Sequence, residues 1–96
     1  MIRRREQQVG DVIREFMRAE GIETPYNEFR VVQAWPEVVG PAVERCTSEV
    51  YVKNGTLYVR LTSSVIRHEL FLGRQQLAQR LNQHVGAQVI TKIVFV

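Results

Sequence analysis

The dipeptide Asn54-Gly55 stands between two segments in which apolar and polar residues alternate, and it is the strongest local constraint on the fold. Both residue types readily adopt positive backbone φ angles, so they favour a two-residue β-hairpin turn in which Lys53 pairs with Thr56. The register of the hairpin follows from this turn. One face carries the pairs Val52 with Leu57 and Val50 with Val59, and the other carries Tyr51 with Tyr58 and Glu49 with Arg60. Each face is chemically consistent, which supports this register.

Helical periodicity precedes the hairpin. From residue 6 to residue 20 apolar side chains recur at three- and four-residue steps, which predicts a helix with one buried stripe. Thr24 and Pro25 favour the start of a second helix, because threonine caps free amides and proline has no amide to leave unpaired. The second helix carries Tyr26, Phe29, Val32 and Trp35, the last of which we interpret as a core residue. We expect Pro36 to kink or restart this helix and Gly40-Pro41 to interrupt it again, so it is predicted to be broken.

A further helix is predicted after the hairpin. Ser63 or Ser64 can cap its first turn, and Gly86 can end it. Its buried stripe is predicted to consist of Ile66, Leu70, Gly73, Leu77 and Leu81. A glycine inside a helix costs about 1 kcal/mol relative to alanine. We therefore expect Gly73 to allow a close approach of this helix to the sheet or to another helix, in preference to acting as a hinge.

The chain ends in the β-branched segment QVITKIVFV, which predicts one strand beside the hairpin. If Lys92 faces the same side as Tyr58, then Val89, Thr91, Ile93 and Phe95 face the helices; the opposite choice of face is a close alternative. The predicted order is helix, broken helix, strand, strand, helix, strand. The fold class is therefore α+β, with helices on one face of a three-stranded sheet.

Length and composition suit one small domain over residues 1–96, with residues 1–5 as a frayed basic arm. One cysteine, Cys46, and two histidines, His68 and His84, offer neither an internal disulfide nor a metal cluster of the usual spacing. The first residues show no apolar run of the kind that export requires. We expect a cytoplasmic protein without metal or cofactor.

The net charge of +3 is mild, but its distribution is uneven. Residues 1–49 hold seven basic and nine acidic side chains, whereas residues 50–96 hold six basic side chains and one acidic side chain, Glu69. Eleven of the thirteen cations are arginine, whose planar fork suits phosphates and carboxylates. The second half is the better candidate for contact with an anion.

The open face of the predicted sheet is the first candidate site. It would show Tyr51, Lys53, Tyr58, Arg60 and Lys92, with Ile90 and Val94 beside them. Aromatic rings interleaved with cations are typical of surfaces that stack bases and neutralise phosphates. Two alternatives remain open: a solvated face whose tyrosines only stabilise the hairpin, and a protein interface favoured by the apolar residues.

Arg67 and Arg74, seven residues apart on one flank of the helix after the hairpin, form a second candidate. They could hold phosphates or an acidic partner, or be solvated or paired with a glutamate from a neighbouring helix. Catalysis has little support, because no Ser/His/acid motif and no glycine-rich phosphate loop occur. The sequence therefore favours binding over enzymatic activity.

Three segments together resemble a known family: WPEVVG from Trp35, NGTLYVRLTSSVIRHEL from Asn54, and LNQHVG from Leu81. Over residues 25–96 the chain resembles the bacterial domain-of-unknown-function family that contains the DciA-type proteins, which associate with the replicative helicase and help to place it on DNA. The matching residues are mostly structural: Trp35, Gly40, Leu57, Val59, Ser63, Ser64, Glu69 and Leu70.

This resemblance implies a fold similar to a K-homology domain and a nonenzymatic role in DNA replication, with the helicase and single-stranded DNA as partners. The G-x-x-G loop by which K-homology domains clamp a nucleic-acid backbone does not occur in this sequence. Any nucleic acid should therefore use another surface, for which the hairpin face is our first choice. The rival hypothesis is a protein-interaction or self-associating module with no role in nucleic-acid binding.

Overall fold

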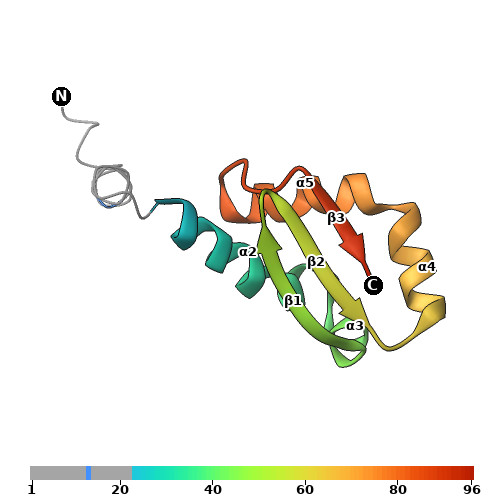
Figure 1. Ribbon diagram of the computed structural model, residues 1–96. Coiled ribbons are helices and arrows are strands. Elements are labelled where there is room, and N and C mark those ends of the chain that lie inside the picture. Colours follow the sequence, from blue (N-terminus) through green and yellow to red (C-terminus); the bar gives the residue numbers. More distant parts are fainter. Residues whose placement is uncertain (1–12, 14–22) are drawn as a thin grey trace.

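The computed structural model describes Ile13 and residues 23–96 (Figure 1). The helix predicted over residues 6–20 and the basic arm Arg3–Arg5 therefore lie outside the described residues. The elements are α2 (Glu23–Val39), α3 (Pro41–Arg45), β1 (Thr47–Lys53), β2 (Thr56–Leu61), α4 (Ser64–Leu72), α5 (Arg74–Val85) and β3 (Lys92–Phe95).

The three strands form one mixed sheet in the order β1-β2-β3, with β1 antiparallel and β3 parallel to the central strand β2. Helices α2 and α5 lie behind this sheet, α4 lies beside β3, and the opposite face of the sheet is open (Figure 1). The predicted α+β class, with helices on one face of a three-stranded sheet, is confirmed. The likeness to a K-homology domain stays a prediction.

The hairpin has the predicted register. Lys53 pairs with Thr56 and Tyr51 with Tyr58, and the pairing continues to Glu49 and Arg60. The turn residues Asn54 and Gly55 have φ angles of 52° and 75°, as the two central residues of a type I′ turn require. Two adjacent residues therefore determine which side of the hairpin faces the core.

The core lies between the sheet and the two helices behind it. Its buried apolar residues are Val31, Ala34, Trp35, Leu57, Val59, Leu61, Leu77, Ala78, Leu81, Val85, Ile90 and Ile93. Trp35 is 1% exposed, and its Nε1 donates a hydrogen bond to Thr47 Oγ1 at 3.1 Å. A buried indole N–H needs such an acceptor. The interpretation of Trp35 as a core residue is confirmed.

Helix α2 differs from its prediction at Pro36. It continues through Pro36 to Val39, so the expected restart after Trp35 is wrong, whereas a kink at Pro36 stays a prediction. A proline removes one donor, but the Pro36 carbonyl still accepts a hydrogen bond from Gly40 N–H at 3.0 Å. The predicted interruption at Gly40-Pro41 is confirmed, since α2 ends at Val39, α3 begins at Pro41, and Gly40 between them has a φ of 92°. Tyr26 and Phe29 are exposed.

The single helix predicted after the hairpin is two helices, α4 and α5, which run in different directions (Figure 1). Ser63 caps α4, and its side chain accepts a hydrogen bond from Ile66 N–H at 3.2 Å. Gly73 ends α4 and begins α5. No atom lies within 4 Å of a Cβ built at Gly73, so the expected close approach is wrong. The glycine separates two helices instead.

The last strand is shorter than predicted and is preceded by a loop in which Ile90 is buried. Lys92 pairs with Thr56 and Val94 pairs with Tyr58, which confirms the predicted choice of face. Ile90 is 0% exposed, so its expected place beside the open face is wrong, and Thr91 is exposed instead of facing the helices. The reason is Asn82 in α5. Its Oδ1 accepts hydrogen bonds from Val89 N–H and Ile90 N–H, and its Nδ2 donates to Ile90 O at 2.8 Å.

Candidate functional site

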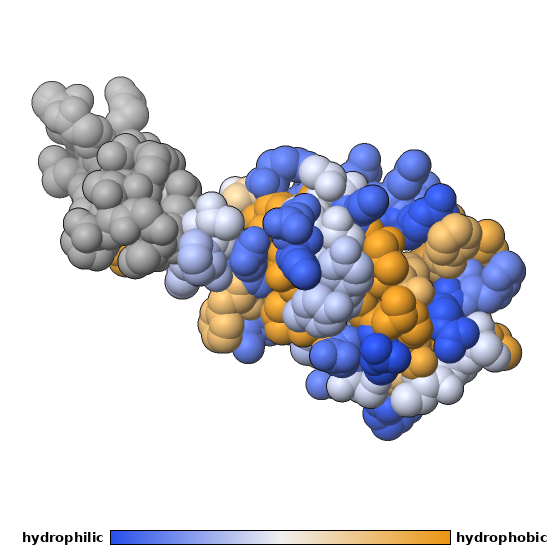
Figure 2. Space-filling view, in the orientation of Figure 1, coloured by the Kyte–Doolittle hydropathy of each residue, from blue (hydrophilic) through white to orange (hydrophobic). Residues whose placement is uncertain are grey.

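Five of the predicted site residues share the open face of the sheet, which we call the hairpin face. They are Tyr51 and Lys53 from β1, Tyr58 and Arg60 from β2, and Lys92 from β3. Their common side follows from the pairing of Tyr51 with Tyr58 and of Lys92 with Thr56, because side chains alternate along each strand. Figure 2, drawn from this side, shows hydrophilic side chains interleaved with apolar surface over the sheet.

The two tyrosines of the hairpin face stack on each other. The ring centroids of Tyr51 and Tyr58 lie 5.0 Å apart with an interplanar angle of 15°. Tyr51 is 44% exposed, whereas Tyr58 is half-buried between it and β3. Such a pair stabilises the hairpin as a cross-strand contact, and it also presents an aromatic surface to solvent. A nucleic-acid base can stack on that surface without unfolding the strand pair.

Cations outnumber carboxylates on the described part of the hairpin face. Arg60 Nε lies 3.3 Å from Glu49 Oε1, and both side chains are more than half exposed. Lys53 and Lys92 are exposed and form no ion pair with any described residue. Three cations thus stand beside one carboxylate on the described part of this face. The field around the tyrosines attracts anions.

Arg67 and Arg74 belong to a different part of the surface, around α4. Arg74 Nη1 donates a hydrogen bond to Phe71 O at 2.8 Å, and its guanidinium lies 3.9 Å from the centroid of the Phe71 ring. Arg67 lines a pocket of about 350 Å³ together with Ser64, His68, Phe71 and Phe95. The structure therefore divides the seven predicted site residues into a set of five on the sheet and a set of two beside it, Arg67 in α4 and Arg74 at the start of α5.

The α4 pocket includes residues that sequence reasoning did not associate with Arg67. Phe95 comes from the end of the chain and meets α4 only through the fold. A helical period gives the flank on which Arg67 lies, and a strand period gives the face of Phe95. Neither period gives the distance between the two elements, so no local signal could have identified this pocket.

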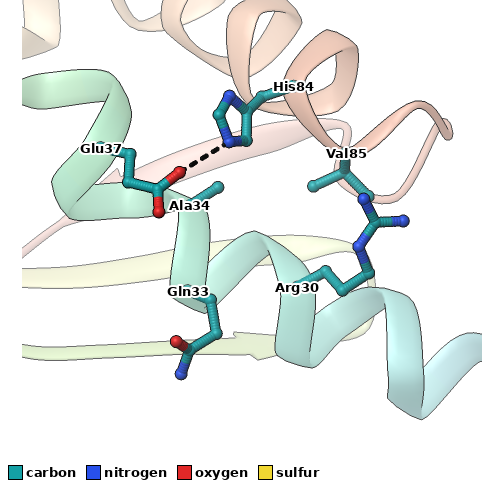
Figure 3. Close-up of a pocket in the computed structure, with 6 residues that line it drawn as sticks. All are labelled: Arg30, Gln33, Ala34, Glu37, His84 and Val85. Carbon is teal, nitrogen blue, oxygen red and sulfur yellow. Dashed lines mark hydrogen bonds and ion pairs between the residues drawn. The ribbon is translucent and has the colours of Figure 1, made fainter.

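A smaller pocket of about 160 Å³ lies between α2 and α5 (Figure 3). His84 Nε2 lies 2.9 Å from Glu37 Oε1 there, and both side chains are largely exposed. His84 occupies the last turn of α5, as predicted, but its partner 47 residues away was not foreseen. Among the residues the structure describes, no three His, Cys, Asp or Glu side chains are grouped to hold a metal ion. The contact between His84 and Glu37 joins α5 to α2 across the pocket, which Arg30 and Gln33 also line.

A family model described as Dna[CI] antecedent, DciA, matches residues 8–95 of the chain. No curated protein matches it significantly. In the described part of the chain no helix combines the length and apolar character needed to cross a bilayer. The matched family is one of loaders and adaptors and is not a catalytic family. Because the match covers nearly the whole sequence, the chain belongs to the DciA family, which implies a role in replicative helicase loading during DNA replication.

Proposed function

We propose that this protein is a noncatalytic adaptor of DNA replication that binds single-stranded DNA weakly through the hairpin face and binds the replicative helicase more specifically. Family membership supports the helicase as partner. We also propose that it acts in the cytoplasm as one domain over residues 1–96, since its family acts in DNA replication.

The observation that carries the DNA proposal is the stacked pair Tyr51 and Tyr58 among exposed cations. Base stacking on an aromatic side chain contributes about 1 to 3 kcal/mol per base and tolerates any sequence. Three cations can contact at most a few phosphates. Since the slope of log K against log salt is about −0.7 per phosphate for single strands, we expect a slope no steeper than about −2.

Fluorescence anisotropy of a labelled single-stranded oligonucleotide, measured at several salt concentrations, tests this proposal. The double variant Tyr58→Ala, Arg60→Ala should lose most of the affinity, because it removes half of the stacked pair and one cation. The matched control is Tyr26→Ala, Arg45→Ala, which removes an exposed tyrosine and an exposed arginine from α2 and α3. Equal affinities of the two double variants would contradict a site on the hairpin face.

The helicase part of the proposal is tested separately, by co-purification of the intact chain with the cognate replicative helicase under mild salt. Retention on the helicase is expected for the wild type and for the Tyr58→Ala, Arg60→Ala variant alike, because the two partners are proposed to use different surfaces. Failure of the wild type to bind the helicase would refute this part without affecting the anisotropy result.

A second candidate function is self-association through the sheet. Val94 is only half-buried beside Tyr58 in the neighbouring strand, and Val96 is 46% exposed. Exposed apolar residues next to tyrosine and arginine are typical of protein interfaces. Sedimentation velocity at several concentrations discriminates between the two functions, since a monomer at all concentrations removes this candidate.

A further inference from the structure

The α4 pocket lies along an open edge of the sheet. It is lined by Ser64, Arg67, His68 and Phe71 from α4 and by Phe95 from β3. Strand β3 is an edge strand, and α4 lies on its outer side (Figure 1). An edge strand presents backbone N–H and C=O groups that no neighbouring strand satisfies. A segment seated in this pocket would therefore meet side chains of α4 and of the edge strand β3 together.

One polar group in this pocket lacks a partner. The Nε of Arg67 is buried from solvent and makes no hydrogen bond in the structure. A buried donor without an acceptor is costly, and more so when it belongs to a charged group. Only Nε is closed off, and the half-buried side chain leaves its two terminal nitrogens accessible, so an incoming acceptor can reach those nitrogens from the pocket. A carboxylate matches the planar arrangement of guanidinium donors.

The surroundings of Arg67 are basic and aromatic. The lining rings are Phe71 and Phe95, and Arg74 stacks on the Phe71 ring. No carboxylate lines this pocket, and Glu69 lines a different one on the other flank of α4. Within the described residues, neither arginine has an acidic partner. The pocket is therefore complementary to an occupant that is both anionic and apolar.

Besides Phe71 in the pocket, α4 exposes apolar side chains on its other flank, where Leu72 lines a second pocket. Val65 is 71% exposed, Leu72 65% and Phe71 47%. Aliphatic side chains such as Val65 and Leu72 offer little to a nucleic acid, which binds cations and aromatic rings. They suit a protein, because interfaces combine apolar side chains with aromatic residues and arginine. The observations thus favour a peptide segment over a phosphate backbone at this surface.

We propose that the α4 pocket binds an acidic segment of the protein partner, with an aspartate or glutamate accepting hydrogen bonds from the terminal nitrogens of Arg67 and an adjacent apolar side chain contacting Phe71 and Phe95. This inference rests on the proposed function, which supplies the helicase as the partner that carries the segment. It assigns Arg67 and Arg74 to a protein and leaves the hairpin face to DNA.

The test uses the intact chain and the cognate replicative helicase. Arg67→Met keeps the length and the apolar part of the side chain but removes the guanidinium. We expect it to lower helicase affinity at least tenfold, to leave affinity for single-stranded DNA unchanged, and to leave the melting temperature unchanged or higher, because the unsatisfied donor is gone. The matched control is Arg45→Met, at an exposed arginine of α3, which should change none of the three.

A second variant and a spectroscopic readout make the result independent of how well Arg67→Met folds. Phe71→Ser, at a half-exposed ring, should also weaken helicase binding. In the wild type, the ¹⁵N-detected Nε–H resonance of Arg67 should shift when the helicase is added, because the guanidinium gains a carboxylate partner. The Nε–H resonance of Arg45 should not move.

Each outcome decides between the hypotheses. Helicase affinity that is equal in the wild type, Arg67→Met and Phe71→Ser would overturn the pocket assignment while the proposed function stands. Loss of DNA affinity in Arg67→Met, with helicase affinity intact, would make the pocket a nucleic-acid site and would also overturn it. A wild type that fails to bind the helicase refutes the proposed partner, and this inference with it.

Discussion

Strand β2 and helix α4 are neighbours in the chain, yet they differ sharply in how they use their apolar residues. Four of the six residues of β2 are buried, whereas none of the nine residues of α4 is. β2 is paired on both sides and covered by helices on one face. Helix α4 contacts the core through the half-buried Ile66 and Leu70 and exposes Val65, Phe71 and Leu72.

This difference separates stability from recognition in the molecule. Apolar residues that contact the core lower the free energy of folding in proportion to the area they bury. Exposed apolar residues contribute little to folding and gain their burial only when a partner covers them. We therefore expect β2 and the residues packed against it to determine stability, and α4 to be available for binding.

The largest predicted effect compares one leucine from each element. Leu57→Ala in β2, at a residue that is 0% exposed, should lower the free energy of unfolding by about 2 to 5 kcal/mol. Leu72→Ala in α4, at a residue that is 65% exposed, should change it by no more than about 0.5 kcal/mol. Urea unfolding followed by circular dichroism measures both. A large effect of Leu72→Ala would indicate that α4 is covered in the free protein, for example by a second copy of the chain.

The next effect concerns the side chain that fixes the loop before β3, the strand parallel to β2. Asn82 is 8% exposed and holds the loop before β3 through Val89 and Ile90. Asn82→Ala leaves these buried backbone groups without partners, so we expect a loss of about 1 to 3 kcal/mol in the free energy of unfolding. Gln83→Ala, at the exposed neighbouring position, is the control. If the two variants unfold alike, then water or a rearranged loop replaces the amide.

The contrast between the hairpin and this loop explains how much of the fold the sequence could predict. The hairpin register depends on adjacent residues, Asn54 and Gly55, and on strict alternation, so local reasoning was sufficient. The burial of Ile90 depends on Asn82, which lies on another element. A strand pattern that starts at Gln88 cannot reveal that its first residues are bonded to a helix instead.

The helix errors have a similar cause. Pro36 and Gly73 are both weak helix residues, and propensity alone predicts a break at the first more than at the second. The structure does the reverse, since α2 continues through Pro36 and the later helix divides at Gly73. Trp35 is buried next to Pro36, whereas a Cβ built at Gly73 would meet no atom within 4 Å, so we infer that tertiary packing decides between the two positions.

For the candidate site, too, the sequence predicted the local features and missed those that depend on tertiary packing. Strand alternation placed five residues on the hairpin face, because side-chain direction is a local property. It could not give the stacking of Tyr51 on Tyr58 in detail or the approach of Phe95 to Arg67, which depend on rotamers and on the packing of distant elements.

A smaller predicted effect compares two glycines, one directly before β2 and one directly after α4. Gly55 precedes β2 with a φ of 75°, and Gly73 follows α4 with a φ of −106°. Gly55→Ala should cost about 1 to 2 kcal/mol, because an L side chain is strained in the left-handed region. Gly73→Ala should be neutral or should stabilise by about 0.4 to 1 kcal/mol, through the lower entropy of the unfolded chain. Thermal unfolding of both variants measures the difference, and destabilisation by Gly73→Ala would mean that the junction of α4 and α5 requires glycine.

The smallest predicted effect tests whether the hairpin face attracts DNA by charge. Glu49 is the carboxylate paired with Arg60, and its replacement in Glu49→Gln removes one negative charge from that face. Exposed pairs contribute about 0 to 1 kcal/mol to stability, so folding should change little. Two unit charges about 7 Å apart in water interact by about 0.6 kcal/mol.

That energy corresponds to about a threefold gain in affinity for single-stranded DNA at low salt. The gain should fade as salt shortens the screening length to about 8 Å and below. Glu69→Gln changes the net charge by the same amount and serves as control, since Glu69 is exposed on α4, away from the hairpin face. Anisotropy titrations of both variants measure the effect. An equal gain in both would mean that only total charge matters, whereas a loss in Glu49→Gln would mean that Glu49 holds Arg60 in the orientation that binds.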